Sequence, residues 1–277
     1  MKLSFYPGCS LEGMANDYAL SITAVFHALG IELIEIDDWS CCGATAAHSL
    51  SEPMSVALPA RNLALAEKMG LDIVAPCANC FNRLRYSQQM VKKKMVDVPW
   101  DLTGDIRIHD ITRFLSEPEM LRRIRERVCR PLRDLKVVCY YGCQMVRHPS
   151  ITGFTDYENP RTLDLLVSAA GAKAIDWSYK STCCGASIGI GRKDIQEALT
   201  RKILDKARQA GAEAVVVSCP LCQSNLDVFQ KDMKEDSLPV FYFTELLRLA
   251  FEEEPDPRWF KRHLTDPVRL LAVKGLV

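Results

Sequence analysis

Cysteine is the residue type through which this chain of 277 residues could do chemistry, because it occurs 12 times. Thiolates bind soft transition metals and exchange electrons, and clustered cysteines in a chain that needs no disulfide staples indicate one of these roles. Ten of the cysteines form two sets of five, each with a single cysteine, an adjacent pair and a C-x-x-C motif. The sets are Cys9, Cys41, Cys42, Cys77 and Cys80, and then Cys143, Cys183, Cys184, Cys219 and Cys222.

The two sets repeat with a fixed spacing. In both, 34 residues separate the adjacent pair from the C-x-x-C motif, and these parts of the second set lie 142 residues after those of the first. A glycine precedes each single cysteine, and Gly-Ala follows each pair. Such self-similarity indicates an internal duplication, so we expect two similar halves with one five-cysteine site each. Cys129 and Cys139 lie outside the repeat, the second in an apolar run typical of a core strand.

The arrangement of the cysteines favours iron–sulfur clusters. A C-x-x-C motif alone does not decide the metal, because zinc ribbons, redox dithiols and iron–sulfur sites all use it. Adjacent cysteines have Cα atoms about 3.8 Å apart, which suits neighbouring irons of a cluster better than one tetrahedral zinc. Five ligands also exceed the four that zinc usually takes. Zinc and cysteine disulfides remain the alternatives.

Every candidate ligand lies after a predicted strand and before a predicted helix. The strands are expected at residues 2–6, 31–36, 72–75, 136–141, 172–175 and 214–218, and the main helices at 14–29, 53–69, 161–170 and 193–210. In an open parallel sheet such loops meet at the carboxyl edge, where helix N-termini also favour thiolates. We therefore predict an α/β fold of two duplicated, Rossmann-like domains, residues 1–131 and 132–277. Each would have a small, mostly parallel sheet with flanking helices and its cluster at the C-terminal strand ends.

Charge and hydropathy exclude several classes of function. The 35 basic and 35 acidic side chains cancel, which argues against bulk electrostatic binding of nucleic acid or of an anionic membrane. No signal-like N-terminus and no apolar run of about 18 residues is present, so we expect a cytoplasmic chain with reduced thiols and no membrane span. No G-x-G-x-x-G motif follows the first strand, so electrons should come from a partner.

The doubled pattern of one cysteine, a Cys-Cys-Gly and a C-x-x-C resembles the CCG domain. The length of the chain and its Tyr-Pro-Gly-Cys start at residues 6–9 resemble the B subunit of heterodisulfide reductase. In that family each CCG domain holds a noncubane 4Fe-4S cluster through five cysteines. The resemblance therefore implies two noncubane 4Fe-4S clusters, one on each set of five cysteines, and both sets are complete.

The resemblance also implies a reaction and partners. A disulfide, CoM-S-S-CoB or a related one, would lie between the clusters, take one electron from or through each, and leave as two thiols. The implied partners are the two-cubane, ferredoxin-like C subunit and the flavin-containing A subunit of heterodisulfide reductase, with hydrogenase, formate dehydrogenase or other electron-input proteins behind them. Two alternatives come from other classes: an electron-transfer iron–sulfur subunit of a complex of the lactate or glycolate oxidation type, and a zinc-binding thiol protein.

Three residues near the cysteines are candidates for a direct part in catalysis. His148 and His48 could donate a proton to a departing thiolate near neutral pH, against the simpler interpretation of an exposed or satisfied histidine. Arg147 could contact an anionic substrate, as could Arg83 and Arg85, against the simpler interpretation of solvated arginines.

Overall fold

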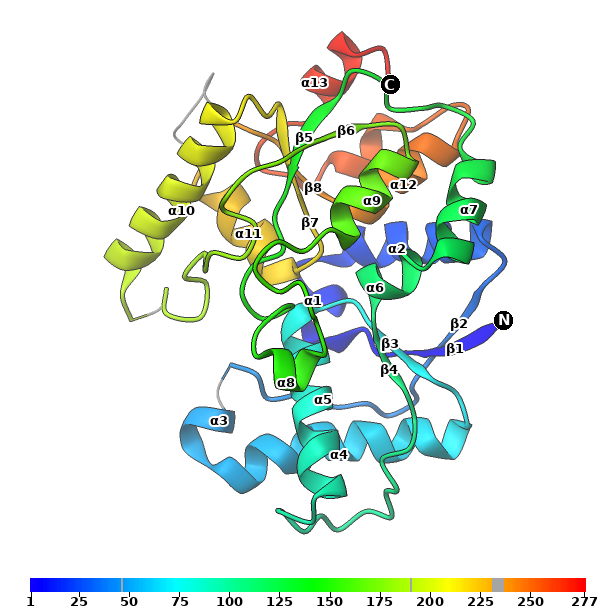
Figure 1. Ribbon diagram of the computed structural model, residues 1–277, viewed down its shortest axis with the longest axis vertical. Coiled ribbons are helices and arrows are strands. Elements are labelled where there is room, and N and C mark those ends of the chain that lie inside the picture. The colour runs from blue at the N-terminus through cyan, green and yellow to red at the C-terminus, as the bar shows by residue number, and fades with distance from the viewer. Residues whose placement is uncertain (46, 190, 231–236) are drawn as a thin grey trace.

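The computed structural model describes residues 1–45, 47–189, 191–230 and 237–277, which form two four-stranded parallel sheets (Figure 1). The first sheet contains β1 (Lys2–Phe5), β2 (Glu32–Glu35), β3 (Ile73–Ala75) and β4 (Ile108–Asp110). The second contains β5 (Lys136–Cys139), β6 (Lys173–Ile175), β7 (Ala214–Val217) and β8 (Val240–Tyr242). Their orders, β2-β1-β3-β4 and β6-β5-β7-β8, are the same. The predicted α/β fold with two equivalent parallel sheets is confirmed.

Helices connect the strands of the first sheet and cover its faces. They are α1 (Gly8–Glu12), α2 (Asn16–Ala28), α3 (Ala47–Leu50), α4 (Glu52–Met69), α5 (Ala78–Lys92), α6 (Ile111–Leu115) and α7 (Pro118–Arg127). The ends of α4 follow from local chemistry: the Ser51 side chain accepts a hydrogen bond from the Met54 amide, and Gly70 ends the helix at φ 66°. Asp110 caps α6 in the same way through the amides of Thr112 and Arg113.

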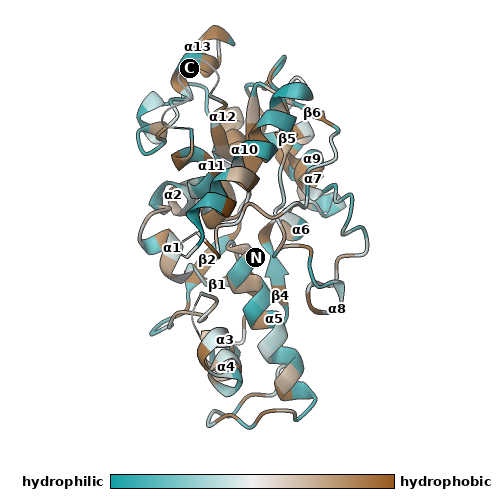
Figure 2. Ribbon diagram, turned by 90° about the vertical axis from the view of Figure 1, so that its left-hand side faces the viewer, coloured by the Kyte–Doolittle hydropathy of each residue, from teal (hydrophilic) through white to brown (hydrophobic). Residues whose placement is uncertain are grey.

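The second half repeats this plan. Its helices are α8 (Pro149–Thr152), α9 (Thr162–Ala169), α10 (Lys193–Gln209), α11 (Pro220–Val228), α12 (Phe243–Phe251) and α13 (Val268–Val273), with a 3-10 turn, η2, at Pro257–Phe260. The ribbon of α10 carries both hydrophilic and hydrophobic turns in Figure 2, because Ile203, Leu204 and Ala207 are buried while its charged residues face outward. Within the described residues, no helix is both long and apolar enough to cross a membrane.

The two halves share one hydrophobic core. Helix α2, between β1 and β2 of the first half, packs against α12, which follows β8 in the second half. In the same way α9, between β5 and β6, packs against α6, which follows β4. In the first pair, the rings of Tyr18 and Tyr242 stack with centroids 4.1 Å apart, and Ser21 Oγ lies 2.7 Å from Thr244 Oγ1. A separate, smaller core lies on the opposite face of the first sheet, toward α4 and α5 at the bottom of Figure 1.

The fourth strand of each sheet was not predicted. The sequence indicates a loop at residues 101–105 and a helix that begins at Phe243, but it gives no sign of the strands β4 and β8 before the helices α6 and α12. Each strand has only three residues, too few to show a period of two, and each forms because it pairs with the strand beside it, β3 or β7. The domain boundary near residue 131 stays a prediction.

Replacement of Ile22 tests the shared core. Its side chain on α2 is 0% exposed, so Ile22→Ala should lower the free energy of unfolding by about 2–5 kcal/mol through lost burial and a residual cavity. Leu20→Ala, on the same helix but at a position that is 57% exposed, should change it by less than about 0.5 kcal/mol. Chemical denaturation of both variants measures the difference, and equal effects would contradict the shared core.

Candidate metal centres

The first set of cysteines lies at the carboxyl edge of the first sheet. Cys9 is in α1 after β1, Cys41 and Cys42 are in the loop after β2, and Cys77 and Cys80 open α5 after β3. The Sγ atoms of Cys42 and Cys80 are 3.3 Å apart, and those of Cys9 and Cys41 are 3.9 Å apart. Five thiols far apart in the sequence thus converge on one site, as expected for loops that leave parallel strands.

The second set is arranged in the same way. Cys143 follows β5, Cys183 and Cys184 follow β6, and Cys219 and Cys222 open α11 after β7. The Sγ atoms of Cys184 and Cys222 are 3.9 Å apart, and Cys143 is hydrogen-bonded to Cys183. All the cysteines of both sets are free thiols.

The two sites adjoin each other. The thiols of Cys77 and of Cys219, the equivalent residue of the other half, lie close enough for each to shift the pKa of the other, and both side chains are buried. The first cysteine of each C-x-x-C motif therefore joins the two sets.

A tyrosine positions the loop before each cysteine pair. Tyr6, at the end of β1, donates a hydrogen bond of 2.7 Å to the carbonyl of Ser40, and Tyr140 donates one of 2.6 Å to that of Thr182. Burial and the neighbouring Cys80 raise the pKa of Tyr6, so its hydroxyl keeps its proton and remains a donor.

Two glycines leave room for a sulfur atom. Gly8 and Gly142 have φ angles of +67° and +68°, which favour glycine. A Cβ atom at Gly8 would lie 2.9 Å from Cys80 Sγ, and one at Gly142 would lie 2.8 Å from Cys222 Sγ. Each glycine thus lets the backbone approach the second cysteine of the C-x-x-C motif in its own half.

The electrostatics of each site stabilise a thiolate in the adjacent pair. The neighbouring thiols of Cys41 and Cys80 lower the pKa of Cys42 to about 3, with a further contribution from the charge of Arg83. A hydrogen bond from Cys143 lowers the pKa of Cys183 to about 6, assisted by the Gly185 amide and the charge of Arg147. Thiolates are the metal-binding form of cysteine, so both pairs are prepared to act as ligands.

The number of cysteines at each site fits a polynuclear group. Each site brings together five soft sulfur donors, one more than the four ligands that zinc usually takes. Five thiolates at one site are suited to an iron–sulfur cluster.

A cavity of about 530 Å³ opens beside the sulfurs of the second set and is lined by both halves. Cys143, Cys183 and Cys222 line one side, and Asn79 and Arg83 of α5 line the other. The first half contributes residues that neighbour its cysteines, but none of those cysteines themselves line the cavity.

The segment after Cys143 is held by α5 of the other half. Asn82 Nδ2 donates to the carbonyl of Arg147 at 2.7 Å, Arg85 Nε to that of Ile151 at 3.2 Å, and Gln89 Nε2 to that of Ser150 at 2.7 Å. The spacing of these three residues places them on one face of the helix. Arg85 is thus engaged in joining the halves and does not line the cavity.

The three catalytic candidates differ in their positions. Arg147 is exposed and lies near enough to Cys183 to lower its pKa, but it does not line the cavity. His148 is exposed at the start of α8 and does not line it either. The side chain of His48 lies outside the part of the chain that the structure describes.

Sequence reasoning missed several residues of the cavity wall. Asn79, Tyr141 and Gln144 line it, and Tyr141 is further fixed by a hydrogen bond of 2.6 Å to Asp164. A comparison of the two repeats could have found Tyr141, because it occupies the position that Pro7 has in the first half.

The fold and the two equivalent cysteine sites define a protein of two cysteine-rich α/β domains. The family described as the cysteine-rich domain, CCG, matches residues 3–85 and 137–227. The chain belongs to this family, and relatives named as B subunits of heterodisulfide reductases are similar to it over nearly their whole length.

Two relatives are similar over nearly their whole length. The "8-methylmenaquinol:fumarate reductase membrane anchor subunit" of Wolinella succinogenes is 30% identical, covering 90% of this chain and 92% of the relative. The B subunit of the "Ferredoxin:CoB-CoM heterodisulfide reductase" of Methanosarcina mazei is 28% identical, covering 98% and 96%. A crystal structure of a hypothetical protein from Helicobacter pylori is similar with a TM-score of 0.66 at 10% identity, over 94% of this chain and 50% of that one, and supports the fold alone.

Substitution of Gly8 tests the first site. In Gly8→Ala the new Cβ would press on Cys80 Sγ, so the purified protein should lose most of the iron of that site. Gly30→Ala is the matched control, because Gly30 has φ +69° and no atom within 4 Å of its Cβ position. Both variants carry backbone strain of about 1–2 kcal/mol, but only the first should lose iron. Equal iron contents would contradict the role of Gly8.

Proposed function

We propose that this chain is the catalytic iron–sulfur subunit of a heterodisulfide-reductase-like complex and reduces a disulfide to two thiols. The observation that carries the proposal is the pair of equivalent five-cysteine sites, which adjoin at Cys77 and Cys219, with a cavity beside the second set that residues of both halves line. A reaction that needs two electrons is served well by two adjoining one-electron centres. The relatives named as B subunits of heterodisulfide reductases support the same reaction.

The ligands of the proposed cofactors are the ten cysteines of the two sets, five for each noncubane 4Fe-4S cluster. When bound, such clusters supply single electrons and iron atoms that can hold sulfur. The chain contributes thiolates prepared by hydrogen bonds, helix N-termini beside the C-x-x-C motifs, and glycines that leave room for the second cysteine of each motif. The zinc alternative is disfavoured by the number of donors, because five cysteines at each site exceed the four ligands that zinc usually takes.

The balance of the reaction defines what the protein must provide. One disulfide, two electrons and two protons give two thiols, so the S–S bond breaks and each sulfur gains one electron and one proton. The electrons would come from two other members of the same cytoplasmic complex, one a two-cubane ferredoxin-like protein and the other a flavoprotein. Arg83 faces the cavity and is suited to bind an anionic group of the disulfide. Arg147, His148 and His48 remain predicted contributors.

A second candidate function follows from the Wolinella succinogenes relative, which is named as part of an 8-methylmenaquinol:fumarate reductase. In that role the cysteine sites would pass electrons from a quinol toward a partner protein. The relative is named a membrane anchor. We place disulfide reduction first, because two adjoining cysteine sites suit a reaction that needs two electrons.

Anaerobic purification with the partner subunits tests the function. The loaded chain should contain about eight irons and reduce a heterodisulfide with a low-potential electron donor. Cys80→Ser should remove about half of the iron and abolish disulfide turnover, whereas Cys129→Ser, outside both sets, should change neither. A fully loaded complex that oxidises a quinol analogue and leaves disulfides intact would establish the second function instead.

Replacement of Arg83 tests the binding of an anionic substrate. Loss of one charged hydrogen bond, worth about 1.5–3 kcal/mol, should raise KM for an anionic disulfide about 10- to 100-fold in Arg83→Gln. A neutral disulfide should show no such change, and Arg122→Gln on the exposed face of α7 should behave as the native protein. The same loss for neutral and anionic disulfides would exclude a role in charge recognition.

A further inference from the structure

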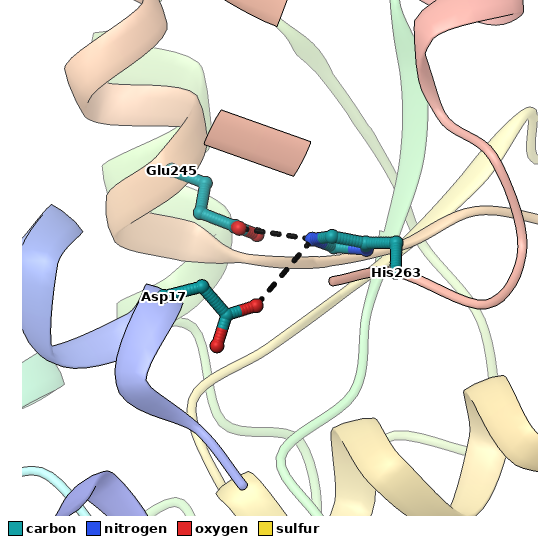
Figure 3. Close-up of side chains that lie close together, drawn as sticks. All are labelled: Asp17, Glu245 and His263. Atoms are coloured by element: carbon teal, nitrogen blue, oxygen red, sulfur yellow. Dashed lines mark hydrogen bonds and ion pairs between the residues drawn. The ribbon is translucent and has the colours of Figure 1, made fainter. Parts of the chain in front are cut away.

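A second group of possible metal ligands lies away from the cysteines. Asp17 of α2, Glu245 of α12 and His263, in the segment after η2, point toward one another (Figure 3). One ligand atom from each lies within 4.8 Å of the others, and it is the one such group of three or more found in the described residues. The group joins the two halves, because Asp17 belongs to the first and the other two residues belong to the second.

The three side chains are close together and buried. His263 Nε2 lies 2.9 Å from Glu245 Oε1 and 3.9 Å from Asp17 Oδ2. The exposed fractions are 0% for the side chain of His263, 4% for that of Glu245 and 9% for that of Asp17. Thus the same imidazole nitrogen faces two carboxylates inside the protein.

The positions of these side chains are fixed by their neighbours. The second oxygen of Glu245 accepts a hydrogen bond of 2.9 Å from the amide of Tyr242. Asp227 accepts hydrogen bonds from the amides of Leu264 and Thr265, which hold the segment that carries His263. A preformed arrangement of donors lowers the cost of binding an ion.

Two polar atoms of the group lack hydrogen-bond partners, and its negative charge is not fully balanced. Asp17 Oδ1 and His263 Nδ1 are buried without a hydrogen-bond partner among the described residues. Two carboxylates with one imidazolium leave a net negative charge in a buried place, whereas a divalent cation with a neutral imidazole balances both carboxylates.

A cavity gives solvent access to the group, and it leaves room for one further ligand of a bound ion. A cavity of about 200 Å³ reaches Asp17 and Glu245 between α2 and α12. Arg248 forms part of its wall, with its guanidinium carbon 3.6 Å from the ring centre of Trp259, and Arg262 lines it as well. A water molecule could therefore complete the coordination from the cavity, and the basic wall would favour a bound hydroxide or small anion there.

We propose that Asp17, Glu245 and His263 bind one divalent transition-metal ion of the zinc type, at a site separate from the cysteine clusters. Two carboxylate oxygens, one imidazole nitrogen and one water form a tetrahedral set that zinc accepts and that Mn²⁺ and Co²⁺ also tolerate. The ion links α2 to α12 and so stabilises the contact between the halves.

Zinc analysis of the full-length, cluster-loaded protein tests the site. After exposure to Zn²⁺ and removal of free metal, the protein should retain one zinc per chain, and zinc X-ray absorption should show only nitrogen and oxygen neighbours at about 2.0 Å. Retention of no zinc would overturn the proposal. A zinc–sulfur distance of about 2.3 Å would overturn it too, because the metal would then occupy the cysteines. This readout does not depend on disulfide turnover, so its failure leaves the proposed function untouched.

Variants locate the metal. Glu245→Gln and His263→Gln should lower retained zinc at least tenfold with the iron content unchanged, whereas Glu252→Gln, exposed at the end of α12, should retain it. Added Zn²⁺ should raise the melting temperature of the native protein and of Glu252→Gln but not of the other two, because an ion stabilises only the folded state that binds it. Equal zinc retention in all the variants would overturn the assignment, and the native measurement decides the question even if a variant fails to fold.

Discussion

The central constraint on the structure is that ten thiols, many of them buried, lie close together at the carboxyl edges of the two sheets, which adjoin each other. Sulfurs that act as ligands must be thiolates, and thiolates so close together repel one another unless hydrogen bonds and positive charge compensate them. The fold supplies this compensation locally: the cysteine pairs receive hydrogen bonds from neighbouring thiols and glycine amides, and the C-x-x-C motifs open α5 and α11. Tyr6 and Tyr140 then fix the loops that carry the cysteine pairs, through hydrogen bonds to the carbonyls just before those pairs.

Much of this arrangement could be predicted from the sequence, because its signals are local. The repeated cysteine spacing predicted two equivalent sites, and apolar runs ending in Gly-Cys or C-x-x-C predicted the strands that carry them. The contact between Cys77 and Cys219 could not be predicted, since no local pattern says how two domains face each other. The same holds for Asp17, Glu245 and His263, which come from distant elements and look like ordinary helix and loop residues in the sequence.

The two halves differ in the residues that border the cavity. Tyr141 replaces Pro7, and its hydroxyl joins a buried network with Asp164 and Lys180 that has no counterpart at the equivalent proline. The cavity accordingly lies on the sulfurs of the second set. Glu245, the third residue of α12, corresponds to Arg113, the third residue of α6. Among the described residues, the carboxylate and imidazole group therefore lies at the contact of α2 with α12 and has no counterpart at the equivalent contact of α9 with α6.

The reciprocal packing of α2 with α12 and of α9 with α6 describes a pseudo-two-fold axis. Cys77 and Cys219 are equivalent residues that contact each other, which places them on that axis. Isologous contacts of this kind are those of a symmetric homodimer. The chain therefore has the layout of a dimer of one-site protomers fused into a single polypeptide. In a single polypeptide the two copies can differ from each other, and the cavity, which lies beside the sulfurs of the second set only, is such a difference.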